Sequence, residues 1–118
     1  AFPAMNAVLA NARLNQAMQE GRAIYVAVVN YAAENDGQYP ESLAELAAED
    51  AMVAEILEKT GEFDYFSDMS PASDARLMIL ASPQTHREKR AVVYADGLAE
   101  IINEAEYQEH VRMRSSGE

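Results

Sequence analysis

The chain has 118 residues, of which 49% are hydrophobic and 8% aromatic, so it is long enough for one domain with a modest core. Its net charge of −11 at pH 7 argues against binding to nucleic-acid phosphates or to an anionic lipid surface, and favours cationic or calcium-loaded partners. The sequence has no cysteine, which excludes disulfides, a thiolate nucleophile and a cysteine-based zinc site.

The first element expected is one long helix over residues 4–35. Apolar side chains recur there at three- and four-residue steps, and Pro3 stands just before the helix, where proline is tolerated. At 1.5 Å per residue such a helix is roughly 48 Å long, whereas a compact domain of this size is about 30 Å across. The first half is rich in Ala and Asn and the second in Ile, Val and Tyr. We therefore expect the second half to pack in the core and the first half to project.

No apolar run of the sequence reaches the ~20 residues that span a bilayer. The longest, residues 23–33, is about half that length and is better interpreted as part of a core helix. The chain opens on Ala1 rather than Met and has no signal-peptide pattern. We therefore expect a processed or truncated product with further sequence upstream.

Residues 35–46, NDGQYPESLAEL, end the long helix and begin another. Gly37 can adopt the left-handed conformation that closes a helix, and Pro40 cannot continue one. Helical periodicity resumes from Pro40 to Lys59, with a possible break near Glu49-Asp50, and Thr60-Gly61 ends it. This stretch is thus either a hinge or, given its acids, a metal-binding loop.

The C-terminal third changes to the periodicity of strands. Compact apolar runs predict strands near 76–81, 91–95 and 98–102, an antiparallel meander of three, with Asp96-Gly97 as a two-residue type I′ turn. Residues 103–113 suggest a short terminal helix. The fold class expected is α+β, with a long N-terminal helix packed on a small antiparallel β-sheet through its Ile24–Ala32 stripe.

The predicted elements form a single domain over residues 1–118. It divides into a helix over 1–35, an acidic connection over 36–75, a sheet over 76–102 and a C-terminal helix and tail over 103–118.

The long helix, the NDGQYPESLAEL stretch and the hairpin of this sequence resemble those of the type IV pilin-like pseudopilins of type II secretion systems, in particular the major pseudopilin of the protein G type. The resemblance rests on a long helix that begins after a proline and runs into a short motif, followed by a hairpin that reads VVYADGLAEI. The matching residues are Tyr31, Asn35, Asp36, Gly37, Tyr39, Pro40, Ser42, Leu43 and Leu46, and Pro3 matches the proline between the membrane-embedded and soluble halves of the helix.

The resemblance implies a non-enzymatic structural subunit of a secretion pseudopilus or a related pilus-like filament. Its precursor would carry a leader, a cleavage site that leaves a methylated N-terminus, and about 20 apolar residues that anchor it in the inner membrane. The domain would be periplasmic, and its partners would be further copies, other pseudopilins and the inner-membrane platform of the secretion system. The residues implied for helix packing are Pro3, Met5, Val8, Leu9 and Ala12, and those for the helix–domain junction are Gly37, Tyr39, Pro40, Leu43 and Leu46.

The sequence departs from this family in its middle and C-terminal parts. Major pseudopilins of this type have a Gly- and Trp-rich middle and an aspartate-containing loop that binds calcium. This chain has no Trp, and Asp96, the acid that matches there, already has a role in the predicted turn. Whether the chain is a major subunit, a minor subunit or a divergent pilin-like protein stays open.

Calcium is the one cofactor considered, in an alternative reading as a calcium- or cargo-binding periplasmic module. The acidic segment 61–74 would supply oxygen ligands, although it lacks the EF-hand pattern. The candidate ligands are Glu62, Asp64, Asp68 and Asp74.

Enzymatic chemistry has little support in the sequence. His86 and His110 lack partners at metal-binding or general-base spacing, and no serine lies in a nucleophile motif; the serines considered are Ser67, Ser70, Ser73 and Ser82.

Charge is unevenly distributed along the chain. Residues 41–74 carry ten acids against Lys59 alone, and the basic cluster is His86-Arg87-Glu88-Lys89-Arg90. An acidic connection and a basic loop over 86–90 could meet between neighbouring copies and set their register, or both could be solvated charges.

Overall fold

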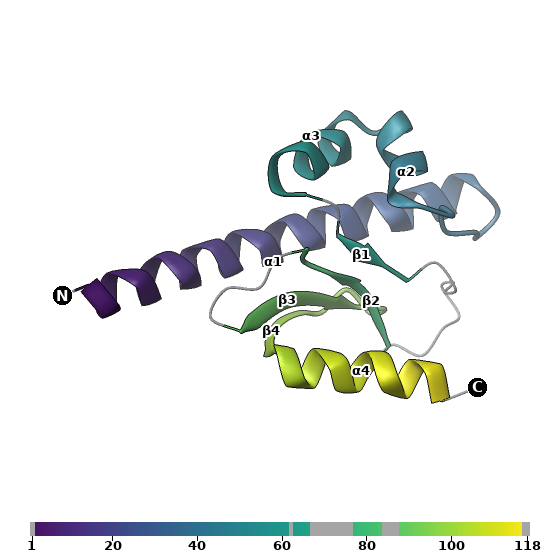
Figure 1. Ribbon diagram of the computed structural model, residues 1–118. Helices are drawn as coiled ribbons and strands as arrows, with labels where there is room; N and C mark the ends of the chain where they lie inside the picture. Colours follow the sequence, from purple (N-terminus) through teal and green to yellow (C-terminus); the bar gives the residue numbers. More distant parts are fainter. Residues whose placement is uncertain (1, 62, 67–76, 84–87, 117–118) are drawn as a thin grey trace.

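The computed structural model describes residues 2–61, 63–66, 77–83 and 88–116; of residues 2–8, 10 and 113–116 it describes the backbone alone. The chain is α+β, with a long N-terminal helix and a four-stranded antiparallel sheet (Figure 1). The helices are α1 (Phe2–Glu34), α2 (Leu43–Glu49), α3 (Ala51–Thr60) and α4 (Glu104–Ser116), and the strands are β1 (Asp64–Tyr65), β2 (Met78–Ala81), β3 (Lys89–Tyr94) and β4 (Ala99–Asn103).

The sheet has the order β1-β2-β3-β4, with every neighbouring pair antiparallel. The predicted meander of three strands is confirmed for β2, β3 and β4 but is wrong in number, because β1 adds a fourth strand. This strand pairs Asp64 with Ala81 and Tyr65 with Leu80. At two residues it is too short for the period-2 alternation by which strands are recognised in a sequence.

The β3–β4 hairpin lies where Asp96-Gly97 predicts it, but its turn is of another type. The Gly97 N–H donates to the Tyr94 carbonyl at 2.9 Å and the Tyr94 N–H to the Leu98 carbonyl at 2.9 Å, so the loop contains three residues. Gly97 has φ 89°, whereas Asp96 is not among the residues with positive φ. A type I′ turn needs positive φ at both positions, and a three-residue loop needs it only at the last. The predicted two-residue turn is therefore wrong.

The sheet is buried on both faces. Along β3, Val93 faces a cluster that includes Ile24 and Val28 of α1, whereas Val92 faces a second cluster closed by Tyr107 of α4. In Figure 1, α1 crosses one face with α2 and α3 beyond it, and α4 lies across the opposite face. The Ile24–Ala32 stripe covers the sheet as predicted. The sheet has a second apolar face, which α4 covers and which the sequence analysis did not predict.

Side-chain caps set the ends of the short helices. The Ser42 Oγ accepts the Glu45 N–H at 3.1 Å and begins α2, and the Asp50 Oδ1 accepts the Met52 N–H at 3.0 Å and begins α3. The predicted break near Glu49-Asp50 is thus confirmed, since Asp50 ends one helix and caps the next. Asn103 caps α4 in the same way, through the Glu106 N–H at 2.8 Å.

Candidate assembly interface on helix α1 and its junction

The N-terminal part of α1 extends beyond the body of the molecule (Figure 1). Going along the described side chains, the first buried ones are Leu14 and Ala17, at 1% and 6% exposure. Before them, Leu9 is 55% exposed and Ala12 is exposed. From Phe2 to Leu14 the helix runs about 18 Å at 1.5 Å per residue. Of the other residues predicted to pack in an assembly, Pro3, Met5 and Val8 lie in α1, and their side chains are outside the described part.

The turn after α1 is built on two left-handed residues. Asp36 has φ 57° and Gly37 has φ 80°, and the Gly37 N–H donates to the Ala32 carbonyl at 2.8 Å. This six-residue closure is the Schellman arrangement, in which Asp36 holds the left-handed position and Gly37 follows it. Gly37 does take the conformation predicted for it, but the sequence did not indicate the shared role of Asp36.

The remaining junction residues fix α2 and β1 to the end of α1. Pro40 is fully buried, and its carbonyl accepts the Tyr65 hydroxyl at 2.6 Å. Tyr39 packs against the core cluster on the α1 side, and Leu43 and Leu46 belong to it at 7% and 3% exposure. The structure thus brings all five predicted junction residues together at one end of the domain.

An acidic patch surrounds Tyr31 where α1 meets α2. The Tyr31 hydroxyl donates to the Glu45 carboxylate, and this hydrogen bond is the main cause that raises the pKa of Tyr31 to about 12. Burial adds to the shift, and so do the negative charges of Glu45, Glu49 and Glu41. We call Glu41, Glu45 and Glu49 the acidic patch.

Helix α1 is also fixed to the hairpin by a tyrosine. The Tyr25 hydroxyl donates to the Ala95 carbonyl at 2.9 Å, and a Cβ placed on Gly97 would lie 2.9 Å from the Tyr25 ring. Burial and the charge of Asp96 raise the pKa of the Tyr25 hydroxyl. Beside it, Val29 and Tyr39 line a hollow of about 370 Å³.

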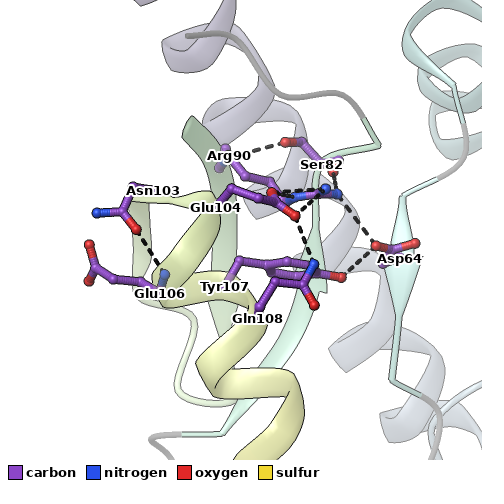
Figure 2. A network of polar contacts seen from close by, with 9 residues as sticks. Asp64, Ser82, Arg90, Asn103, Glu104, Glu106, Tyr107 and Gln108 are labelled. Carbon is purple, nitrogen blue, oxygen red and sulfur yellow. Dashed lines mark hydrogen bonds and ion pairs between the residues drawn. The ribbon is translucent and has the colours of Figure 1, made fainter. Parts of the chain in front are cut away.

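Arg90 is the centre of a polar network between the sheet and α4 (Figure 2). Its guanidinium lies 3.1 Å from the Glu104 carboxylate, donates to the Ser82 carbonyl at 2.7 Å and lies 4.2 Å from the centre of the Tyr107 ring. Asp64 of β1 accepts the Tyr107 hydroxyl at 2.6 Å and lies 3.5 Å from Arg90. The network therefore joins β1, β3, the residue after β2 and α4.

The sequence placed Arg90 in a basic loop over 86–90, and this placement is wrong. Lys89 and Arg90 begin β3, and His86 and Arg87 lie outside the described residues. The Arg90 side chain is only 13% exposed, and it forms ion pairs with Asp64 and Glu104 of its own chain. Period 2 along β3 puts Arg90 on the same face as Val92 and Tyr94, and this signal could have located it.

The calcium candidates are only partly within the described structure. Glu62, Asp68 and Asp74 lie outside the described residues. Asp64 lies in β1, where its carboxylate is engaged by Tyr107 and Arg90. Among the residues that the structure describes, no group of three or more acids or histidines could hold a metal ion.

The histidine and serine candidates that the structure describes, His110 and Ser82, make contacts within the fold. His110 packs against the Tyr94 ring with centroids 5.8 Å apart. Ser82 is 2% exposed, and its Oγ accepts the Ala91 N–H at 3.1 Å. Ser67, Ser70 and Ser73 lie outside the described residues.

The described helices include none that is both long and apolar enough to cross a membrane. Comparison of the chain with protein-family models, with curated proteins and with solved structures gave no match.

Proposed function

We propose that the chain is the periplasmic part of a pilin-like pseudopilin, a non-catalytic subunit of a type II secretion filament that assembles through α1. The single observation that carries this proposal is the extension of α1 by about 18 Å beyond Leu14, the first of its described side chains that is buried. Isolated helical turns gain little stability in water, and most helical stability in proteins comes from packing. A projecting half-helix is therefore best explained by a partner that packs on it.

The side chains of this half that the structure describes before Leu14 are exposed and suit contact with other helices. Leu9 offers apolar surface, and Ala12 and the neighbouring alanines allow two helix axes to approach closely. The sequence upstream of Ala1 would continue the helix as the apolar membrane anchor.

The junction explains how such a subunit would hold its domain at a fixed angle to the filament axis. Tyr25 and Tyr65 each hydrogen-bond a backbone carbonyl, of Ala95 and Pro40 respectively, and the core cluster buries the second half of α1 against the sheet. The domain is thus held to the second half of α1, and the projecting half continues the same helix.

Cysteine cross-linking tests the proposal in the native host, because the described sequence has no cysteine of its own. Leu9→Cys combined with Ala12→Cys should give cross-linked ladders in the sheared surface or periplasmic fraction. The matched control is Gln108→Cys, an exposed position on α4, which should give none. Monomers alone from the α1 variant would contradict assembly through this helix.

The upstream coding sequence provides a second, independent test. About 20 apolar residues with a glutamate near their start, preceded by a glycine cleavage site, are expected. A conventional signal peptide in that place would overturn the family assignment.

A further inference from the structure

The chain has a net charge of −11, so described cations without an ion pair inside the chain are candidates for contact with an acidic surface. Among the described residues, Arg90 and Arg112 form ion pairs within the chain. The described cations for which no ion pair is found are Arg13, Arg22, Lys59 and Lys89. Two of these four, Arg13 and Lys59, line the same hollow.

This hollow, of about 220 Å³, lies between α1, the end of α3 and the residues after β2. We call it the Arg13–Lys59 hollow. Gln16 and Glu20 of α1 also line it, with Thr60 and Ser82. The Glu20 carboxylate accepts the Thr60 hydroxyl at 2.8 Å, so the acid in the hollow already has one donor. Among the described residues that line it, two cations stand against one carboxylate, which gives this lining a net positive charge.

The acidic patch lies at the other end of the packed part of α1. The charges of its three carboxylates all raise the pKa of Tyr31. Tyr31 lies 18 positions after Arg13 on the same helix. At 1.5 Å per residue this is a distance of about 27 Å along the axis, so the patch and the hollow of one copy are well separated.

We propose that the Arg13–Lys59 hollow receives carboxylates from the Glu41–Glu45–Glu49 patch of a second copy of this chain. Positions 13 and 31 are about five full turns apart and lie on the same side of α1, so two copies with parallel α1 helices meet in this way when one is displaced by about 27 Å along the axis and rotated by about half a turn around it. The contact joins two different surfaces, so each copy keeps one hollow or one patch free, and the arrangement extends as an open series.

Charge complementarity within the chain identifies the second copy as the occupant. At a net charge of −11, two copies repel each other unless opposite charges are brought together. Arg90 is engaged internally, so within the part of the chain that the structure describes the α1–α3 side is where two cations without an ion pair converge. The inference rests on the proposed function, because it names the contact that sets the register of such an assembly.

The test joins the two surfaces by a disulfide between copies. Gln16→Cys and Glu49→Cys are introduced on separate copies of the 118-residue chain, which are mixed and oxidised. Both positions are exposed, one at the rim of the hollow and one in the patch. A heterodimer band should form several times faster than with Gln108→Cys in place of Gln16→Cys.

Charge reversal then shows whether the ion pairs drive the contact. Lys59→Glu or Arg13→Glu should lower the rate of cross-linking by about threefold or more, since each change removes an ion pair at the rim and adds repulsion. The matched control Lys89→Glu makes the same charge change outside the hollow and should leave the rate as it was. Pairing Lys59→Glu on one copy with Glu45→Lys on the other should restore it, and circular dichroism confirms that each variant is folded.

Equal rates for Lys59→Glu, Lys89→Glu and the unchanged chain would overturn the inference, as would equal cross-linking from Gln108→Cys. Neither result affects the proposed function, which depends on cross-links through Leu9 and Ala12. If those fail while the hollow and patch still cross-link, the copies associate but not as a filament built on α1.

Discussion

At the level of single residues, Arg90 shows how one cation can hold several elements together. The guanidinium is planar and has five donors, so it can meet Glu104, Ser82 and Asp64 while its face covers the Tyr107 ring. Helix α4 otherwise contributes few apolar side chains to the core, chiefly Tyr107 and Val111. We therefore expect the network to contribute strongly to the attachment of α4.

Replacing Arg90 by Met should lower the free energy of unfolding by about 2 kcal/mol, since it removes a mostly buried partner of Glu104. Arg90→Lys keeps the charge but loses the planar guanidinium with its five donors, so its free energy of unfolding should lie between those of Arg90→Met and the unchanged chain. Lys89→Met, at the exposed neighbouring position, should change the value by less than ~0.5 kcal/mol. Urea denaturation measures all three, and equal midpoints for Arg90→Met and the unchanged chain would refute the role of the network.

The tyrosines predict how the fold responds to alkali. All six have a pKa above the usual 10 in the folded chain, which reaches about 12 for Tyr31 through its hydrogen bond to Glu45. Between pH 10 and the folded pKa values, the tyrosine hydroxyls of the unfolded chain have lost their protons whereas those of the folded chain keep them. The stability that comes from this difference is present below pH 10 and is lost as the pH rises toward the folded pKa values.

Phenolate absorbance of the folded protein should therefore rise at higher pH than that of the protein in denaturant. Glu45→Gln removes the charge beside Tyr31 and should bring its pKa back toward 10, so the first part of the titration should come at lower pH. Superimposable titrations of the folded and denatured protein would show that burial and hydrogen bonding do not raise the pKa values of the tyrosine hydroxyls.

At the level of elements, α1 and β3 approach each other closely at Gly21. A Cβ built on this buried glycine would lie 2.9 Å from the Val93 Cγ2 and 3.5 Å from the Phe63 ring. In an open helix, alanine would be more stable than glycine by about 1 kcal/mol. Here the contact with Val93 opposes this gain, because an overfilled core costs roughly 1–3 kcal/mol.

Gly21→Ala should accordingly destabilise the protein by ~1 kcal/mol, whereas Gln19→Ala on the exposed side of the same helix should be neutral or slightly stabilising. Combining Gly21→Ala with Val93→Ala should cost less than the sum of the two changes, because the added methyl group then occupies space that valine has left. Thermal or urea unfolding of the four variants gives the coupling, and strict additivity would exclude the close contact as the cause.

The elements also show what the sequence could and could not predict. The end of α1, the start of α2 and the break at Asp50 follow from local chemistry, since Gly37, Ser42 and Asp50 act on their own neighbours. The type of the hairpin turn depended on how Ala95 joins the loop, and β1 depends on pairing with a strand that lies further along the chain. The Arg90 network joins residues 26 and 14 positions apart, which no local pattern specifies.

At the level of the whole molecule, the fold and the proposed assembly use different parts of one helix. The molecule measures 53 × 35 × 18 Å, and α1 runs along its length. Residues 14–32 of α1 carry the described side chains that it buries in the domain, while Leu9 and Ala12 before them are exposed. Folding should therefore be separable from association, which a shortened chain can test.

A chain that begins at Asn11 should keep its free energy of unfolding within ~0.5 kcal/mol, because Leu9, the deleted side chain that the structure describes, is exposed. The same chain with Leu14→Ala should lose about 2–5 kcal/mol, since Leu14 is 1% exposed and its removal leaves a cavity. Filament formation in the host should be lost in the first variant although its domain is fully folded. A loss of more than ~1.5 kcal/mol on deletion alone would mean that the projecting half of α1 serves the fold.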